Sequence, residues 1–488
     1  MSVVFGPRLQ GVKGAIAAGH PLTAEAGARI LAAGGNAVDA CIAAAFTSWV
    51  CESPLTGPGG GGFMLVHDAR DGETRLLDFF VAVPAAARAT GELLELAVDF
   101  DGDTQQLFRT GAAAVAVPGT ALGLGTAHRR WGTVPWAELA APAARLAREG
   151  VELTPAQAYL HRILDGLLRH SPEGDAMYGG RALTAGERFA VPELGETLER
   201  IGADGAEALY GGELARAIVQ HVQAGGGTLT PEDLAGYRVV RRRPLSVEYR
   251  GHEFRSNPPP SAGGLLVALG LQVLGDAKPT PDAIAEAMEA QESARGGGFV
   301  RALHRGGLAQ RVLSGTTHIS VVDAHGSAAS LSASLGSGSG VVVPGTGIHL
   351  NNMLGEADLV TGARPGERLT SMMAPSIVLR AGVPRLVLGS AGSARLRGAI
   401  LQVVANVVAR ELSVTDAVDA PRVHVEGGVA HCEDAAVADR FEAEGRAVVR
   451  FRRRNLYFGG VSAVEVLADG SLAAAGDPRR GGAGVVIP

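Results

Sequence analysis

Residues 315–335, GTTHISVVDAHGSAASLSASL, are the stretch from which the fold and chemistry of this chain are best inferred. The apolar pattern predicts one strand beginning at Thr316 and a second strand ending near Leu335, with a turn at residues 324–327. Two threonines, Thr316 and Thr317, therefore stand at the beginning of a strand, directly after Gly315.

A threonine in this position can become a nucleophile if the chain is cut before it. Its hydroxyl is weakly reactive until a base removes the proton, and an N-terminal threonine carries such a base in its own α-amine. The pKa of a free α-amine is about 8, so the amine can accept and return a proton near neutrality. The hypothesis therefore requires cleavage between Gly315 and Thr316, and Gly315 suits it because no Cβ separates the hydroxyl from the preceding carbonyl.

The surrounding segments alternate between helix and strand patterns. Helices are predicted at residues 23–33 (with Thr23 as the N-cap), 37–51, over much of 135–240, at 265–274 and from about 396. Strands are predicted at residues 63–69, 75–83, 244–254, 374–390 and 461–477. This order indicates an α+β fold with sheets packed between helical layers. Residues 277–315 are the least patterned, and their glycines favour a mobile segment before a cleavage site.

Composition excludes several classes of function. The 488 residues are 46% apolar and 19% charged, with a net charge of −6, so no basic footprint for nucleic acid is present. The three cysteines have no metal-ligand spacing, and no metal or cofactor is expected. The apolar run at residues 37–50 is too short to span a bilayer, and the N-terminus lacks a signal-peptide pattern, so a cytoplasmic protein without membrane contact is expected.

The glycine-rich loop at residues 54–62 does not indicate a nucleotide site. The sequence PLTGPGGGG lacks the GxxxxGK[ST] pattern, and a strand follows it instead of a helix. Close backbone packing explains these glycines better.

The chain resembles the γ-glutamyltranspeptidase family over nearly its whole length. The similar motifs, in the order expected for that family, include GHPLTAEAGARILAAGGNAVDA (19–40), PLTGPGGGGF (54–63), TTHISVVD (316–323), GIHLNNML (347–354), MAPSIVL (373–379) and AGDPR (475–479). The resemblance implies the αββα fold of N-terminal nucleophile hydrolases, with two stacked antiparallel sheets between helical layers. It also implies self-cleavage into a large chain, 1–315, and a small chain, 316–488, which associate in one interleaved fold.

The same resemblance assigns roles to residues around the cut. Thr316 aligns with the nucleophile of the family, and Thr317 with a threonine whose hydroxyl would bond the amine or assist cleavage. Ser334 stands where the family keeps a threonine, and its hydroxyl could orient Thr316 Oγ. Gly392 and Ser393 occupy the positions of two glycines whose N–H groups form an oxyanion hole. His318 is expected to be structural.

The positions that bind γ-glutamyl substrates in the family differ here. Phe80 replaces the arginine that grips the α-carboxylate, and it cannot bind an anion. Gly336 replaces an asparagine, while Met353 and Glu356 replace the glutamine and aspartate that contact the α-amino group. The family's serine pair becomes Ser371-Met372, or Thr370-Ser371 if the alignment has a one-residue gap. The segment between Glu356 and Ser371 is short, so a lid loop is not expected.

Three functional hypotheses follow. The leading one is a self-cleaving hydrolase with a non-glutamyl small-molecule substrate, cleaving an amide or a carbon–carbon bond in natural-product biosynthesis. The second is an ordinary γ-glutamyl hydrolase or transpeptidase that acts on glutathione-like substrates. The third is an uncleaved homologue that binds without catalysis. A homodimer of processed heterodimers is a further expectation.

Overall fold

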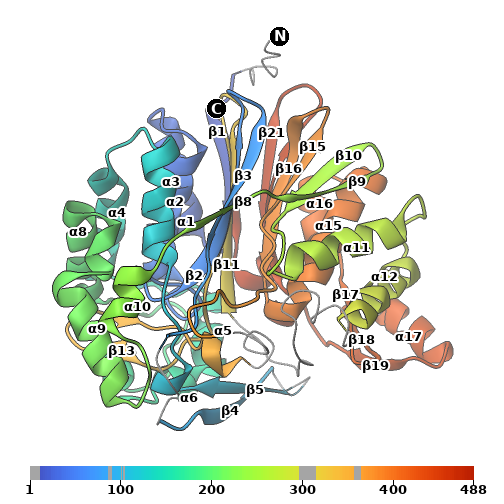
Figure 1. The fold of residues 1–488 in the computed structure, drawn as a ribbon. Coiled ribbons are helices and arrows are strands. Elements are labelled where there is room, and N and C mark those ends of the chain that lie inside the picture. Colours follow the sequence, from blue (N-terminus) through green and yellow to red (C-terminus); the bar gives the residue numbers. More distant parts are fainter. Residues whose placement is uncertain (1–10, 86–90, 101, 103–104, 296–314, 357–363) are drawn as a thin grey trace.

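The computed structural model describes residues 11–85, 91–100, 102, 105–295, 315–356 and 364–488. Two antiparallel sheets face each other at the centre of the molecule (Figure 1). The seven-stranded sheet has the order β22 (Ala483–Ile487), β1 (Gly14–Ala18), β11 (Gly315–Asp323), β12 (Ala328–Gly336), β2 (Gly61–Asp68), β3 (Glu73–Phe79) and β8 (Val240–Arg242). The six-stranded sheet has the order β21 (Leu472–Gly476), β20 (Gly460–Val466), β16 (Val383–Ala391), β15 (Ser376–Arg380), β10 (His252–Ser256) and β9 (Leu245–Tyr249).

A layer of helices covers the outer face of each sheet (Figure 1). The layer beside the seven-stranded sheet includes α1 (Pro21–Ala32), α2 (Ala37–Cys51), α3 (Thr120–Trp131), α4 (Trp136–Glu149), α8 (Pro192–Asp204), α9 (Gly212–Ala224) and α10 (Pro231–Gly236). The layer beside the six-stranded sheet includes α11 (Gly263–Leu274), α12 (Pro281–Ala294), α15 (Leu396–Ala409), α16 (Val414–Asp419) and α17 (Ala435–Ala443). This arrangement is the predicted α+β fold of two sheets between helical layers, so that prediction is confirmed.

Smaller elements cover the ends of the sheets. In the described part of the chain these include the α-helices α5 (Pro155–Ile163), α6 (Asp165–Leu168) and α7 (Pro172–Met177). Short sheets are formed by β4 (Leu94–Asp99) with β5 (Gln105–Thr110), β6 (Val151–Glu152) with β7 (Arg188–Phe189), β13 (Val342–Val343) with β14 (Ile348–His349), and β17 (Val423–Glu426) with β18 (Val429–Cys432) and β19 (Ala447–Arg450). None of the described helices is long and apolar enough to cross a bilayer.

Strand β11 is central in this architecture because both of its faces are buried. Ile319 and Val321 pack toward the helices of the first layer, whereas Val322 belongs to the apolar cluster between the two sheets. Polar side chains on the inner face are paired: Ser320 Oγ donates to the Ser462 carbonyl (3.0 Å), and the two ring nitrogens of His318 lie 2.7 Å from Ser332 Oγ and 3.0 Å from Ser320 Oγ. Burial lowers the pKa of His318 to about 3, so the ring is neutral, and its structural role stays a prediction.

Several predicted elements match the structure closely, while two details differ. The predicted helix at residues 37–51 is α2 (Ala37–Cys51), capped by Asn36. The first helix begins at Pro21 with His20 as its N-cap, not Thr23, because His20 Nδ1 accepts from the Leu22 N–H. Residues 281–294, predicted to lack pattern, form α12, whose buried residues are Ile284, Ala285, Ala287, Met288 and Gln291. The mobile segment expected at 296–314 lies outside the described residues.

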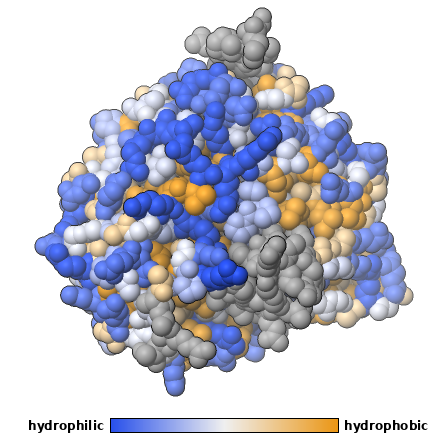
Figure 2. Space-filling view, in the orientation of Figure 1, coloured by the Kyte–Doolittle hydropathy of each residue, from blue (hydrophilic) through white to orange (hydrophobic). Residues whose placement is uncertain are grey.

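The surface in the view of Figure 1 is mainly hydrophilic (Figure 2). An apolar patch occupies the right of that view, where α11 lies, and Val273 of α11 is 46% exposed. The three cysteines are all buried and none forms a disulfide. Across the residues that the structure describes, no cluster of three or more His, Cys, Asp or Glu side chains could hold a metal ion.

Candidate active site at the start of strand β11

Gly315 and Thr316 open β11 in a local irregularity of the sheet. Gly315 pairs with Gly336 and Thr317 pairs with Ala333, so Ser334 and Leu335 of β12 both lie opposite Thr316, and the extra residue of this β-bulge is on β12. A bulge bends a strand and redirects its side chains, which often happens beside active sites. A Cβ on Gly315 would lie 2.6 Å from the Gly336 carbonyl oxygen, so only glycine fits before Thr316. The Thr316 side chain is buried, and among the described residues its Oγ has no hydrogen-bond partner.

Ser334 on β12 contacts the bond before Thr316. Its Oγ donates a short hydrogen bond to the Gly315 carbonyl oxygen and accepts one from the Gly336 N–H (2.8 Å). The predicted contact with Thr316 Oγ is therefore replaced by a contact with the carbonyl that Thr316 would attack. A donor at this oxygen withdraws electron density from the carbonyl carbon and favours attack on it.

Thr317 contacts a carboxylate that the sequence interpretation missed. Thr317 Oγ donates to Glu52 Oε2 (2.7 Å), and Thr23 Oγ donates to Glu52 Oε1 (3.0 Å). Glu52 follows the end of α2 and is almost fully buried. Burial raises its pKa to about 6, against the opposing effects of both hydroxyl hydrogen bonds and the Arg480 charge. A lone glutamate between an apolar helix and a glycine-rich loop was the signal available in the sequence.

A small enclosed cavity lies beside Thr316 and Thr317. It is lined by Gly19, Glu52, Leu55, Gln157, Thr316, Thr317, His318, Ala391, Gly460, Ser462, Asp477 and Arg480. These residues come from both sheets and from α5, so the cavity lies where the two halves of the sandwich meet at the start of β11. The catalytic candidates thus face an enclosed polar space.

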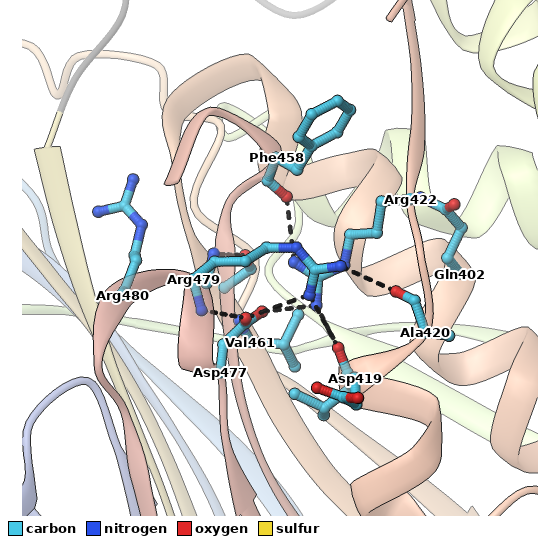
Figure 3. A network of polar contacts seen from close by, with 12 residues as sticks. Gln402, Asp419, Ala420, Arg422, Phe458, Val461, Asp477, Arg479 and Arg480 are labelled. Atoms are coloured by element: carbon cyan, nitrogen blue, oxygen red, sulfur yellow. Dashed lines mark hydrogen bonds and ion pairs between the residues drawn. The ribbon is translucent and has the colours of Figure 1, made fainter. Parts of the chain in front are cut away.

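Arg480 reaches this cavity from a turn held by a buried ion-pair network (Figure 3). Asp477 binds Arg422 (2.6 Å) and Arg479 (3.2 Å), and Arg479 also pairs with Glu433. Figure 3 shows Arg480 pointing away from this network. Burial lowers the pKa of Arg480 to about 10, with a further lowering from Arg395 that Asp477 and Glu52 oppose, so the side chain is a cation at neutral pH.

The loop after β16 carries the two predicted oxyanion-hole residues. Ala391, which lines the cavity, is followed by Gly392 with φ of 124° and Ser393 with φ of 57°. A Cβ on Gly392 would lie 2.7 Å from Gly459 Cα, so glycine is required there. Ser393 adopts the left-handed conformation despite its side chain, a strained geometry that is frequent at functional sites. The oxyanion role of both N–H groups stays a prediction.

Phe80 and Met353 lie in the apolar cluster between the sheets. Both side chains are about 1% exposed, and the Phe80 ring stacks on Phe63 with 5.5 Å between centroids. The Phe80 carbonyl accepts from the Tyr237 hydroxyl and from Arg368 Nη1, both at 2.7 Å. The backbone at this position is therefore fixed, and its side chain adds to an apolar core instead of a polar site.

Gly336 lies between Ser334 and Glu356. Its N–H donates to Ser334 Oγ, and it has φ of 77°. A Cβ there would overlap Asn352 Oδ1 and approach Glu356 Oε1 to 2.9 Å. The Gly336 position therefore cannot accept a side chain while Asn352 and Glu356 keep their places, and the buried Glu356 carboxylate lies near Gly336.

Ser371 and Met372 belong to a segment that binds the loop before α11. The Ser371 carbonyl accepts from the Ala262 N–H and from Ser261 Oγ, both at 2.8 Å, while its own Oγ accepts from the Met373 N–H. Thr370 Oγ donates to the Pro260 carbonyl (2.8 Å). Ser371 is buried and Met372 is partly buried. These hydrogen bonds hold residues 370–373 against the loop before α11.

Comparison with known proteins places the chain in one family. The sequence profile described as Gamma-glutamyltranspeptidase matches residues 23–305 and 289–487. The chain belongs to the γ-glutamyltranspeptidase family. It is accordingly an N-terminal nucleophile hydrolase or transferase, as the resemblance implied.

Relatives within the γ-glutamyltranspeptidase family carry two kinds of name. The chain is 35% identical to the acylase ACY 1 proenzyme of Pseudomonas sp. (strain SE83), over 98% of this chain and 94% of that protein. It is 32% identical to the glutathione hydrolase proenzyme of Pseudomonas aeruginosa (strain PAO1), over 100% and 96% of the two chains. Cephalosporin acylase from Bacillus halodurans has a similar fold, with a TM-score of 0.83, 27% identity, and coverage of 97% and 96%.

Against this family background, the structure brings one group of the predicted residues together. Gly315, Thr316, Thr317 and Ser334 lie around one peptide bond, Gly336 contacts Ser334, and Glu356 lies near Gly336. Phe80 and Met353 belong instead to the inter-sheet core. The sequence interpretation missed Glu52, Gln157 and Arg480, which line the cavity beside Thr316.

Proposed function

We propose that this enzyme cuts its own chain between Gly315 and Thr316 and then uses Thr316 to hydrolyse a substrate whose acyl group is not γ-glutamyl. The observation that carries the proposal is the buried Phe80 ring at the position where the family resemblance expects a carboxylate-binding arginine. Because Phe80 and Met353 pack in the core between the sheets, neither offers a charge or a hydrogen bond to a γ-glutamyl group.

The mature reaction would proceed in two steps. Thr316 Oγ attacks the acyl carbonyl while the free α-amine of Thr316 takes the hydroxyl proton, and the N–H groups of Gly392 and Ser393 stabilise the oxyanion. The leaving group departs with that proton and leaves an ester on Thr316. Water then attacks the ester, its proton passes through the amine to Thr316 Oγ, and the acid is released.

The loss of a guanidinium at position 80 has an energetic consequence. Removing one partner of a buried charge pair at a binding site costs about 2–5 kcal/mol, or roughly 30-fold to several thousand-fold in affinity. We therefore expect glutathione and γ-glutamyl anilides to be poor substrates. An amide bond, as in an acylase reaction, is the first choice for the bond cleaved.

A carbon–carbon bond is the second possibility, because the same steps apply when the leaving group departs as an enolate-like carbanion. A role in natural-product biosynthesis and a cytoplasmic location remain predictions, which gene context and cell fractionation would test. The homodimer of processed heterodimers also remains a prediction.

A γ-glutamyl hydrolase is the alternative function, and the buried Glu356 favours it. A buried carboxylate near Gly336 is suited to the α-ammonium group of a glutamyl donor. If the enzyme turned over γ-glutamyl p-nitroanilide as fast as glutathione hydrolases do, this alternative would replace the non-glutamyl proposal.

The decisive experiment is intact mass spectrometry of the purified protein with a panel of acyl donors. We expect two masses, one for residues 1–315 and one for residues 316–488. Aliphatic or aromatic acyl anilides should add the mass of their acyl group to the smaller chain, whereas γ-glutamyl anilide should add none. Thr316→Ala is the control, and we expect it to stay uncleaved and unmodified. A single uncleaved mass for the wild-type chain would instead support the non-catalytic hypothesis.

A further inference from the structure

The cavity beside Thr316 has the size and polarity of a site for one water molecule. The space open to the centre of a water-sized sphere is about 10 Å³, which is about the volume that a single water requires. Its walls include the hydroxyl of Thr316 and the side chains of Glu52, Gln157 and Arg480.

Three of these wall residues carry polar atoms that need a partner. Within the described residues, no hydrogen bond is made by Thr316 Oγ, Gln157 Oε1, or the Nε and Nη1 atoms of Arg480, and all are buried. A buried polar atom without a partner costs about 1–3 kcal/mol, and a buried water is normally held by two to four hydrogen bonds. Arg480 supplies donors and Gln157 an acceptor, so a single water between them satisfies both kinds of atom.

Glu52 supplies a proton acceptor in the same cavity. Thr317 donates to Glu52 Oε2 (2.7 Å), and Thr23 donates to Glu52 Oε1 (3.0 Å). Each carboxylate oxygen still has a lone pair that can accept another hydrogen bond. Thr316 and Thr317 are adjacent at the bulge, so the hydroxyl of one and the carboxylate bound to the other border the same space.

We propose that Glu52 accepts the proton of Thr316 Oγ during self-cleavage through one water molecule held by Gln157 and Arg480. The proposal rests on the proposed function, because it assumes that the bond between Gly315 and Thr316 is cut. Glu52 is the proton acceptor of this step, and Arg480 and Gln157 are positioning residues that act through the water.

Self-cleavage begins with the transfer of one proton. The Thr316 Oγ–H bond breaks, and the bridging water takes that proton and passes one of its own to Glu52. Thr316 Oγ then forms a bond to the Gly315 carbonyl carbon. Ser334 stabilises the resulting oxyanion at the Gly315 oxygen. The carbon–nitrogen bond then breaks as Glu52 returns the proton through the water to the Thr316 nitrogen. A second water hydrolyses the ester, which releases the Gly315 carboxylate and the Thr316 amine and hydroxyl.

The electrostatics around Glu52 suit this role. Burial raises the pKa of Glu52 to about 6, so the carboxylate is ionised at neutral pH yet is a stronger base than an exposed glutamate. Arg480 and Asp477 are the charged groups on the opposite wall. The other titratable neighbours stay neutral: burial lowers the pKa of His318 to about 3 and of His20 to about 4, and it raises the pKa of Cys51.

The test follows cleavage of the full chain, pulse-labelled in a cell-free system and chased at pH values from 5 to 9. Only ionised Glu52 accepts a proton, so the wild-type rate should rise with pH, with a midpoint near 6, and then level off. Glu52→Gln should cleave about 100-fold more slowly without that midpoint, because removing a general base typically costs at least this factor. Asp323→Asn, which removes a buried carboxylate at the far end of β11, is the matched control and should cleave normally.

Two further variants separate a proton relay from a purely structural role. Arg480→Met removes a charge that stabilises ionised Glu52, so the midpoint should move about one unit to higher pH. Gln157→Met should slow cleavage without moving the midpoint. These two variants keep the test informative if circular dichroism shows that Glu52→Gln does not fold.

The outcomes also distinguish this proposal from the one on which it rests. If the wild-type chain is never cut before Thr316, the proposed function fails. If the wild type is cut and folded Glu52→Gln matches its rate and pH profile, only the Glu52 relay is overturned. An unchanged midpoint in Arg480→Met would likewise contradict the relay.

Discussion

Ser334 is the residue whose contact most directly concerns the bond to be cut. Its hydroxyl donates to the Gly315 carbonyl oxygen, where negative charge would develop during attack by Thr316. Removing a comparable oxyanion donor from an enzyme costs about 100-fold or more in rate. We therefore predict that Ser334→Ala cleaves its own chain about 100-fold more slowly, as measured by denaturing electrophoresis over time.

A matched control is available two residues earlier on the same strand. Ser332 bonds the buried His318 ring and not the Gly315 carbonyl, so Ser332→Ala should cleave at nearly the wild-type rate if it folds. Ser334→Thr should also retain cleavage, because it keeps the hydroxyl. Equal slowing in Ser332→Ala and Ser334→Ala would indicate a general packing effect instead of a role for the donor.

Phe80 provides the second prediction at the residue scale. Because its ring packs on Phe63 inside the inter-sheet cluster, an arginine there would bury a charge among apolar groups. We predict that Phe80→Arg lowers the melting temperature strongly and does not create γ-glutamyl turnover, whereas Phe80→Leu lowers it only modestly. A stable Phe80→Arg variant that hydrolyses γ-glutamyl anilide would show that position 80 faces the substrate.

The motif at the start of a predicted strand indicated Gly315 and Thr316, and the family resemblance added Ser334. Glu52 and Arg480 were missed since they come from segments far away along the chain. Thr317 and Glu52, for example, are 265 residues apart, and only the packing of α2 against β11 brings them together. Pairings of this kind depend on the tertiary fold, which composition and periodicity do not specify.

At the scale of elements, the secondary-structure prediction was right where the apolar run was long. The run at residues 37–51 was predicted as a helix, and it is buried on every side as α2, between α1, α4 and the central strands. Helix α12 escaped prediction because only Ile284 and Met288 of its five buried residues are large and apolar, while the others are two alanines and Gln291. Small residues give a weak periodic signal even when they pack closely.

The turn between β21 and β22 gives the prediction at this scale. Burial alone would raise the pKa of Asp477, but attraction by Arg422 and Arg479 and two backbone hydrogen bonds outweigh it and lower the pKa. Removing one partner of a buried ion pair costs about 3–5 kcal/mol. We predict that Asp477→Asn loses stability of this size in urea unfolding and also slows self-cleavage, because Arg480 depends on this turn.

The exposed ion pair of Asp419 and Arg454 is the control for that prediction. Both side chains are about half exposed, so Asp419→Asn should change stability by at most about 1 kcal/mol.

The effect of Asp477→Asn on stability should also depend on pH. A carboxyl whose pKa is lowered by folding stabilises the fold above its unfolded pKa of about 4, and that stabilisation is lost as pH falls below it. The difference between wild type and Asp477→Asn should therefore shrink at acidic pH, and a constant difference would argue against the ion pairs.

At the scale of the whole molecule, the proposed cut does not divide the fold into two domains. In the seven-stranded sheet, β1, β2, β3 and β8 come from residues before Thr316, whereas β11 from Thr316 onward, β12 and β22 come from the chain that begins at Thr316. Strand β11 pairs with β1 on one side, and β12 pairs with β2 on the other. The predicted large and small chains therefore share the seven-stranded sheet and the hydrophobic clusters on its two faces.

This interleaving predicts that the cleaved products stay together without a covalent link. Separating them would break the hydrogen bonds of four strand pairs, β1 with β11, β1 with β22, β12 with β2, and β10 with β15, and would expose the core between α2 and β11. The two chains should therefore elute as one species in native size-exclusion chromatography, and unfold together in a single urea transition monitored by circular dichroism. Elution of separate chains under native conditions would contradict this prediction, as would an early transition confined to one chain. The uncleaved Thr316→Ala chain is the reference, and we expect its native elution volume to match that of the cleaved enzyme.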